Sequence, residues 1–123
     1  MQTIEKNLVA LAQVANEDGS DLYGNFLLSD EEVFGSYKGI RDRLVITNKR
    51  IIVIDVQGLT GKKKEFLFIP FSKIVSYSVE SAGTIDLNSE LKLWLSGVGG
   101  IKFNFVPKTD IFGIGQFIGK YII

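Results

Sequence analysis

Beyond residue 30, apolar and polar residues alternate in several segments, and two β-branched runs, at residues 43–47 and 51–56, are also typical of strands. The clearest example is the segment in which Ile101, Phe103 and Phe105 alternate with Lys102 and Asn104. Because successive side chains of a β-strand point to opposite faces, this alternation predicts strands that are buried on one face. We predict seven strands, at residues 31–39, 43–47, 51–56, 65–69, 74–79, 90–95 and 101–106.

The two ends of the chain show a helical pattern instead. Ile4, Leu8, Leu11 and Ala15 recur every three or four residues, which predicts a helix over residues 3–16. The last stretch, about 13 residues that follow a proline, is strongly apolar and predicts a second helix. This helix is too short to cross a membrane, and we expect it to plug the open end of a small barrel.

The length of 123 residues is typical of a single domain. We expect residues 1–30 to form the N-terminal helix and a connector, and residues 31–123 to form the antiparallel barrel with its C-terminal helix. The start of the chain lacks the basic and apolar regions of a signal peptide. The expected location is the cytoplasm, with peripheral contact to a membrane as an alternative.

The composition argues against an enzyme. The chain has no cysteine and no histidine, which removes a thiolate nucleophile and the commonest general base and metal ligand. Glu80, Asp86 and Glu90 lack the spacing of a calcium-binding loop, and no general acid accompanies them. We therefore predict no catalytic residue, no metal and no cofactor. A nucleic-acid partner is not expected either, because the net charge is zero and the phenylalanines fall at core-facing positions.

The zero net charge conceals a strong segregation of charge along the chain. Residues 1–37 hold seven acidic residues and one basic residue, whereas residues 38–64 hold eight basic residues and two acidic ones. Such a distribution steers an anionic ligand or membrane toward the basic part, or joins the acidic segment of one copy to the basic segment of the next. The alternative is that both segments are simply solvated faces.

The basic segment contains a glycine-bracketed loop, VQGLTGKKKEF, at residues 56–66. It is not a nucleotide-binding loop, because only two residues separate its glycines and Lys63 stands where a serine or threonine would bind magnesium. One interpretation is a hairpin turn with solvated lysines; the other is an anion-binding or partner-binding surface. The candidate residues for that surface are Lys38, Arg41, Arg43, Lys62, Lys63 and Lys64.

Other residues suggest contacts within the chain or between copies. Arg41 and Arg43 lie on one face of a predicted strand and are expected to form structural ion pairs, with Glu80, Asp86 or Glu90 as candidate partners. Trp94 lies in an alternating strand and is expected in the core. The candidate residues for a contact between copies are Glu31, Glu32, Gly115 and Gly119.

Residues 40–97 carry a run of motifs that resembles the bacterial pleckstrin-homology-like domain family. The run comprises Arg-Asp at 41–42, Thr-Asn-Lys-Arg at 47–50, Asp55, Gln-Gly at 57–58, Thr-Gly-Lys-Lys at 60–63, Ile-Pro at 69–70, Glu80, Ala-Gly at 82–83, Asp86, Glu-Leu-Lys at 90–92 and Trp94. The resemblance implies a pleckstrin-homology-like barrel capped by the C-terminal helix. It also implies a small domain of unsettled role, in a family whose members associate into ring-like homo-oligomers and are not established phosphoinositide binders.

The function that we predict is therefore a non-enzymatic assembly module that forms a ring of identical copies. One face of each barrel would meet a different face of the next, and strand 31–39, as an edge strand, would add main-chain pairing. The alternative is recognition of an anionic lipid or a phosphorylated ligand through the basic residues.

Overall fold

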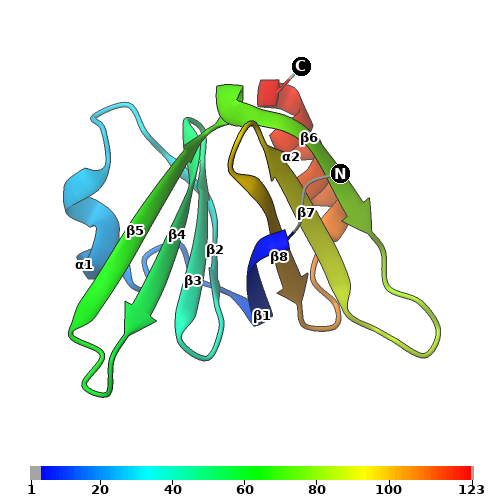
Figure 1. Ribbon diagram of the computed structural model, residues 1–123, viewed down its shortest axis with the longest axis horizontal. Helices are drawn as coiled ribbons and strands as arrows, with labels where there is room; N and C mark the ends of the chain where they lie inside the picture. Colours follow the sequence, from blue (N-terminus) through cyan, green and yellow to red (C-terminus); the bar gives the residue numbers. More distant parts are fainter. Residues whose placement is uncertain (1–3, 123) are drawn as a thin grey trace.

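The computed structural model describes residues 4–122, which form a strongly curled sheet of eight strands and a long C-terminal helix (Figure 1). The strands are β1 (Ile4–Val14), β2 (Val33–Lys38), β3 (Asp42–Thr47), β4 (Arg50–Gln57), β5 (Lys63–Pro70), β6 (Ile74–Glu80), β7 (Ser89–Leu95) and β8 (Gly99–Phe105). The helices are α1 (Ser20–Tyr23) and α2 (Ile111–Ile122), and short 3-10 turns occur at η1 (Gly24–Phe26) and η2 (Phe71–Lys73). The predicted fold class, mainly β with a capping C-terminal helix, is confirmed.

The strands follow the order β5-β4-β3-β2-β1-β8-β7-β6 across the sheet. Neighbours are antiparallel except for β1 and β8, which are parallel. All seven predicted strands are present, and β1 is the eighth. The edge strands are β5 and β6, so the prediction that segment 31–39 forms an edge is wrong: β2 lies between β1 and β3.

The predicted N-terminal helix is also wrong, because this segment is the strand β1; residue 3, included in that prediction, lies outside the described residues. The register of β1 against β8 shifts between Leu8 and Leu11, and Ala10 between them has a φ of 56°. This irregularity brings Leu8 and Leu11 into the same core, where both are buried. Because the strand bulges between them, Leu8 and Leu11 are buried on the same face although they are three residues apart. A spacing of three residues is what a helix would show.

The main core fills the concave side of the sheet. Leucine, isoleucine and phenylalanine side chains from strands β1, β3, β4, β7 and β8 meet there. Helix α2 closes this core with Ile111, Ile114 and Ile118, which recur at helical spacing and are all buried. The expectation that the final helix plugs the open end is therefore confirmed.

A second apolar cluster covers the convex side of β3, β4 and β5. Tyr23 of α1 is fully buried against Val45, Ile52 and Ile54. Phe26 packs on Phe66 and Phe68 of β5, with ring centroids 5.0 and 5.1 Å away. The segment between β1 and β2 is therefore a second layer on this half of the sheet.

Trp94 does not lie in the core, contrary to the prediction. Leu93 and Leu95 occupy the buried face of β7, so strand alternation turns Trp94 outward, where it is half-buried. Its ring covers Gly100 of β8, where a Cβ atom would come within 2.6 Å of it. The tryptophan shields the convex face of the neighbouring strand.

Candidate functional site

The two basic turns of the chain are held side by side. The guanidinium of Arg41, in the β2–β3 turn, donates a short hydrogen bond to the carbonyl oxygen of Gly58 in the β4–β5 turn. Gly58 and Gly61 have φ values of 76° and 70°, which confirms that glycines supply the left-handed positions of this turn. The loop at residues 56–66 is therefore a hairpin connection between β4 and β5.

Several cations of these turns remain exposed. Lys38, Arg41, Lys62 and Lys63 are exposed, and the half-buried Lys64 donates from Nζ to the carbonyl oxygen of Gly61 at 3.0 Å. Within residues 4–122, no carboxylate lies within ion-pair distance of any of these side chains. Five of the six basic candidates thus form one group at one end of the sheet.

Arg43 does not belong to this group. Its Nη1 atom lies 2.8 Å from Oδ1 of Asp18, and its side chain is only 12% exposed. The prediction of a structural ion pair is therefore confirmed for Arg43, although the partner comes from the segment after β1. Of the three carboxylates considered as partners, Glu90 instead pairs with Lys102 at 3.1 Å.

The Thr-Asn-Lys-Arg turn at 47–50 holds the buried carboxylate of Glu31. Arg50 donates to both carboxylate oxygens at 2.9 Å, and the hydroxyl of Thr47 donates at 2.7 Å. The amide of Leu28 adds a further hydrogen bond at 3.1 Å. Burial opposes ionisation of Glu31, but these hydrogen bonds outweigh it and lower the pKa of the carboxyl. Glu31 thus anchors the connector to the β3–β4 hairpin.

Neighbouring residues strengthen the same junction. The side chain of Asn48 accepts from the amide of Glu32 at 2.8 Å and donates to the carbonyl of Asp30 at 3.2 Å. Lys49 pairs with Asp30 at 2.8 Å. The side chain of Glu32 is exposed, whereas that of Glu31 is buried. Of the two acidic candidates for a contact between copies, only Glu32 is therefore accessible to a second copy.

The segregated charges of the sequence therefore meet largely within one chain. Asp18, Asp30 and Glu31 of the acidic segment pair with Arg43, Lys49 and Arg50 of the basic segment. The charges available to a ligand or a second copy are consequently fewer than the sequence indicates. The basic turns retain theirs because none of their side chains forms an ion pair in the described part of the chain.

Carboxylates also line the concave side at the same end of the sheet. Asp42 and Asp55 face each other across β3 and β4, and Lys6 of β1 lies 3.4 Å from Asp55 and 3.9 Å from Glu65. Burial, and then the neighbouring carboxylate of Asp55, raise the pKa of Asp42. Lys6 offsets part of the repulsion and attaches β1 to this row of acids.

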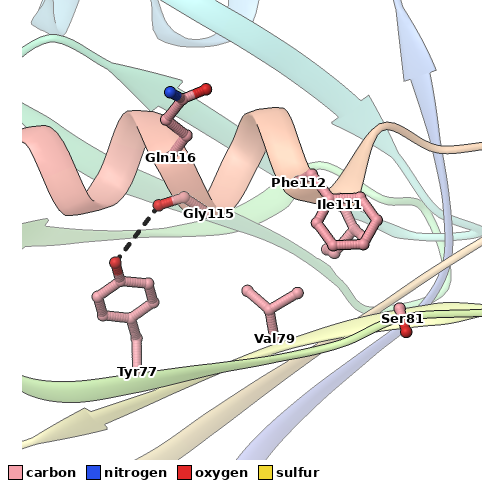
Figure 2. A pocket seen from close by; sticks show the side chains of 7 residues that line it. All are labelled: Tyr77, Val79, Ser81, Ile111, Phe112, Gly115 and Gln116. Atoms are coloured by element: carbon pink, nitrogen blue, oxygen red, sulfur yellow. Dashed lines mark hydrogen bonds between the residues drawn. The ribbon is translucent and has the colours of Figure 1, made fainter.

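A different surface lies where helix α2 passes the edge strand β6. Gly115 accepts a hydrogen bond from the hydroxyl of Tyr77 at 3.4 Å, and a Cβ atom on Gly119 would come within 2.6 Å of that hydroxyl. One hollow of about 410 Å³ lies beside this contact (Figure 2), and a second hollow, of about 720 Å³, is also lined by Tyr77 and Gly115. The two glycines thus allow α2 to approach β6 of its own chain. We call β6, the exposed side of α2 and the 81–88 loop the β6–α2 surface.

The β6–α2 surface exposes unusually many apolar side chains. Val75 is 67% exposed, Phe112 is 71% exposed and Leu87 is 52% exposed. Sequence reasoning named Gly115 and Gly119 of α2, which line the larger hollow, but it took β6 as an ordinary strand and could not see that β6 ends the sheet. The apolar residues on both faces of segment 74–79 were the available signal.

The sequence model of the family described as "Bacterial PH domain" matches residues 2–122 of the chain. The chain belongs to the bacterial PH domain family. Within residues 4–122, no helix is long and apolar enough to cross a membrane. Family membership, together with the curled sheet and capping helix, agrees with the resemblance found in the motifs.

Similar bacterial proteins include two from Bacillus subtilis strain 168 that are described as uncharacterized. YjqA is 52% identical over 73 residues, which cover 59% of this chain and 58% of YjqA, so the chain matches little more than half of that relative. YozO is 29% identical over 96 residues, covering 78% of this chain and 82% of YozO.

Solved structures of bacterial PH domains superpose on most of the chain. A DUF1696 family protein with a pleckstrin-homology domain from Shewanella loihica is 37% identical, with a TM-score of 0.79, over 93% of this chain and 98% of its own. The pleckstrin homology domain from Shewanella amazonensis is 40% identical, with a TM-score of 0.67, over 89% and 90% of the two chains.

Proposed function

We propose that this bacterial PH domain is a non-enzymatic interaction module that assembles with copies of itself into a closed ring. The β6–α2 surface carries the proposal. An edge strand presents unpaired main-chain groups, and here it is bordered by exposed apolar side chains and two hollows. Several exposed apolar side chains beside a free edge strand are typical of a contact between proteins.

Two chemically different edges favour a ring over a symmetric dimer. β6 carries a single charged residue, Glu80, whereas β5 begins with Lys63, Lys64 and Glu65. A contact between unlike surfaces is heterologous, and it forms a ring when the rotation between neighbours closes after a whole number of copies. The acidic and basic segments contribute less than their sequence suggests, because their main ion pairs form within the chain.

The test is a charge placed on the β6–α2 surface. Val75→Lys introduces a charge at a position that is 67% exposed, so we expect the chain to fold and the assembly to dissociate at least in part. Val98→Lys is the matched control, because Val98 is 63% exposed in the turn between β7 and β8. Sedimentation velocity measures the assembly, and an unchanged sedimentation profile for Val75→Lys would contradict this use of the surface.

A second candidate function is binding to an anionic membrane surface through the basic turns. One observation favours it: Ile40 and Leu59, at the tips of the two turns joined by Arg41, are 84% and 106% exposed. Exposed aliphatic tips beside unpaired cations combine apolar insertion with attraction to acidic headgroups.

Cosedimentation with vesicles tests this candidate. We expect binding to vesicles that contain phosphatidylglycerol, weaker binding at high salt, and loss of binding in an Ile40→Ser, Leu59→Ser variant. Absence of binding to these vesicles at low ionic strength would exclude the membrane function. Val98→Ser serves as the control for loss of an exposed aliphatic side chain elsewhere.

A further inference from the structure

We propose that a hollow at the N-terminal end of helix α2 binds a free amino acid with an apolar side chain. The hollow has a volume of about 310 Å³ and lies between the start of α2, the loop that follows β6 and the start of β7. Figure 2 shows Ser81, Ile111 and Phe112, which form one side of it. None of the residues of the basic turns lines this hollow, and the inference does not depend on the proposed self-assembly.

A buried hydroxyl group without a partner lines the hollow. Ser89, the first residue of β7, is only 3% exposed, and within residues 4–122 its Oγ atom has no hydrogen-bond partner. Strand alternation places its side chain on the concave face with Leu91, which is the face that α2 covers. Because a buried hydroxyl without a hydrogen bond destabilises a protein, such groups almost always have a partner. The unpaired hydroxyl of Ser89 therefore indicates a ligand in this hollow.

The first turn of α2 supplies a second hydrogen-bond donor. The amide of Gly113 donates to Oδ1 of Asp110 at 3.1 Å, whereas the amide of Phe112 has no partner within the part of the chain that the structure describes. Free amides at the start of a helix carry partial positive charge and favour a carboxylate. The amide of Phe112 and the hydroxyl of Ser89 can thus donate to the carboxylate of one ligand.

Two opposite charges at the rim of the hollow indicate a zwitterionic ligand. Lys108 and Asp110 both line the hollow and are exposed. Neither forms an ion pair with the other or with any other residue of the segment 4–122. A simple anion would be repelled by Asp110, and a simple cation would be repelled by Lys108. A free amino acid satisfies both, because its carboxylate pairs with Lys108 and its ammonium group pairs with Asp110.

The walls of the hollow suit an apolar side chain. Leu87 and Phe112 are 52% and 71% exposed, and both line the hollow together with Ile111. An aliphatic ligand side chain would remove part of this apolar surface from water. Sites for small molecules measure about 300 to 1,000 Å³ and combine apolar walls with a few polar groups. The hollow lies at the small end of this range, which fits a ligand of the size of one amino acid.

Calorimetric titration of the wild-type protein with L-leucine tests the proposal. We expect leucine to bind, and to bind at least tenfold more tightly than 4-methylpentanoate, which lacks the ammonium group, or leucinamide, which lacks the carboxylate. Leucine should also raise the midpoint of thermal unfolding. No binding at millimolar leucine would overturn the proposal, and equal binding of leucine and 4-methylpentanoate would overturn the zwitterionic class of ligand.

Ser89→Ala separates a role in binding from a role in folding. Because the hydroxyl has no partner in the free protein, its removal should leave the stability of the free protein unchanged or higher. The same substitution should weaken leucine binding about tenfold, since it removes a hydrogen bond to a carboxylate. Ser36→Ala is the matched control, because Ser36 is a buried hydroxyl without a partner that does not line the hollow. Equal leucine affinity in the Ser89→Ala variant and the wild type would overturn the assigned site.

Lys108→Gly tests the cation at the rim. Lys108 has a φ of 73°, a conformation that suits glycine, so the variant should fold at least as well as the wild type. We expect its leucine affinity to fall about tenfold. Lys73→Ala removes an exposed lysine that does not line the hollow, and an equal loss of affinity in that control would overturn the role of Lys108. A wild-type protein that binds leucine as a monomer would contradict the proposed function but would support this inference.

Discussion

At the scale of single residues, the fold depends on a few polar contacts whose partners lie far apart in the sequence. The Thr-Asn-Lys-Arg turn at 47–50 belongs to the motif that resembles the family, and the structure gives a physical reason for it. Thr47 and Arg50 hold Glu31, while Asn48 holds the backbone on either side of Glu31. The residues themselves were visible in the sequence, but their partners were not, because 16 or more positions separate them.

Glu31 is predicted to make stability depend on pH. Its pKa is lowered on folding from the ordinary value of 4.5, so its contribution is complete above that value and is lost as pH falls through the lower pKa of the folded state. Glu31→Gln should reduce the free energy of unfolding at pH 7 by roughly 2 kcal/mol.

Urea unfolding between pH 7 and pH 3 measures this effect. The difference between wild type and Glu31→Gln should shrink as the pH falls below 4.5. A constant difference across the range would show that ionisation of Glu31 contributes nothing. Glu32→Gln, a substitution at the exposed neighbour, is the control and should change little.

We predict that position 119 must be glycine, because the hydroxyl of Tyr77 occupies the space that a side chain would need. A Cβ atom there would lie 2.6 Å from that oxygen, so Gly119→Ala should destabilise the chain by about 1 kcal/mol, although alanine favours helix. Tyr77→Phe removes the obstacle, and in that background Gly119→Ala should become neutral or stabilising. Thermal unfolding of the two single variants and the double variant measures this coupling; additive effects would contradict it.

At the scale of elements, alternation and helical spacing predicted seven strands and α2, and both predictions hold. The failure at β1 has a specific cause. Its left-handed residue at Ala10 shifts the strand between Leu8 and Leu11, and the resulting spacing of three imitates a helix. Pattern alone also could not reveal that β2 is internal, because the order of strands depends on β1 entering the sheet beside it.

The irregularity in β1 predicts an unusual response to glycine. Ala10 has a φ of 56°, a conformation that costs an L-residue energy but suits glycine, so Ala10→Gly should be neutral or stabilise by up to about 1 kcal/mol. Ala12→Gly, in the regular part of β1, should destabilise by roughly the same amount. Chemical unfolding compares the two variants, and equal destabilisation would contradict the assigned backbone of β1.

At the scale of the whole molecule, the curled sheet leaves two free edges, and the candidate sites lie around them. The sequence identified the cations of the basic turns correctly as a group, except that Arg43 is used within the chain. Of the β6–α2 surface it identified only Gly115 and Gly119, because exposure of Val75 and Phe112 follows from the position of β6 at the end of the sheet.

The molar mass of the purified wild-type protein in solution tests the central claim most directly. Light scattering after size exclusion, at low and at high salt, should give one discrete multiple of 13.7 kDa. We expect salt to change this mass little, because the segregated charges pair within each chain and the proposed contact relies on main-chain bonds and apolar side chains. A mass of 13.7 kDa in both buffers would contradict self-assembly.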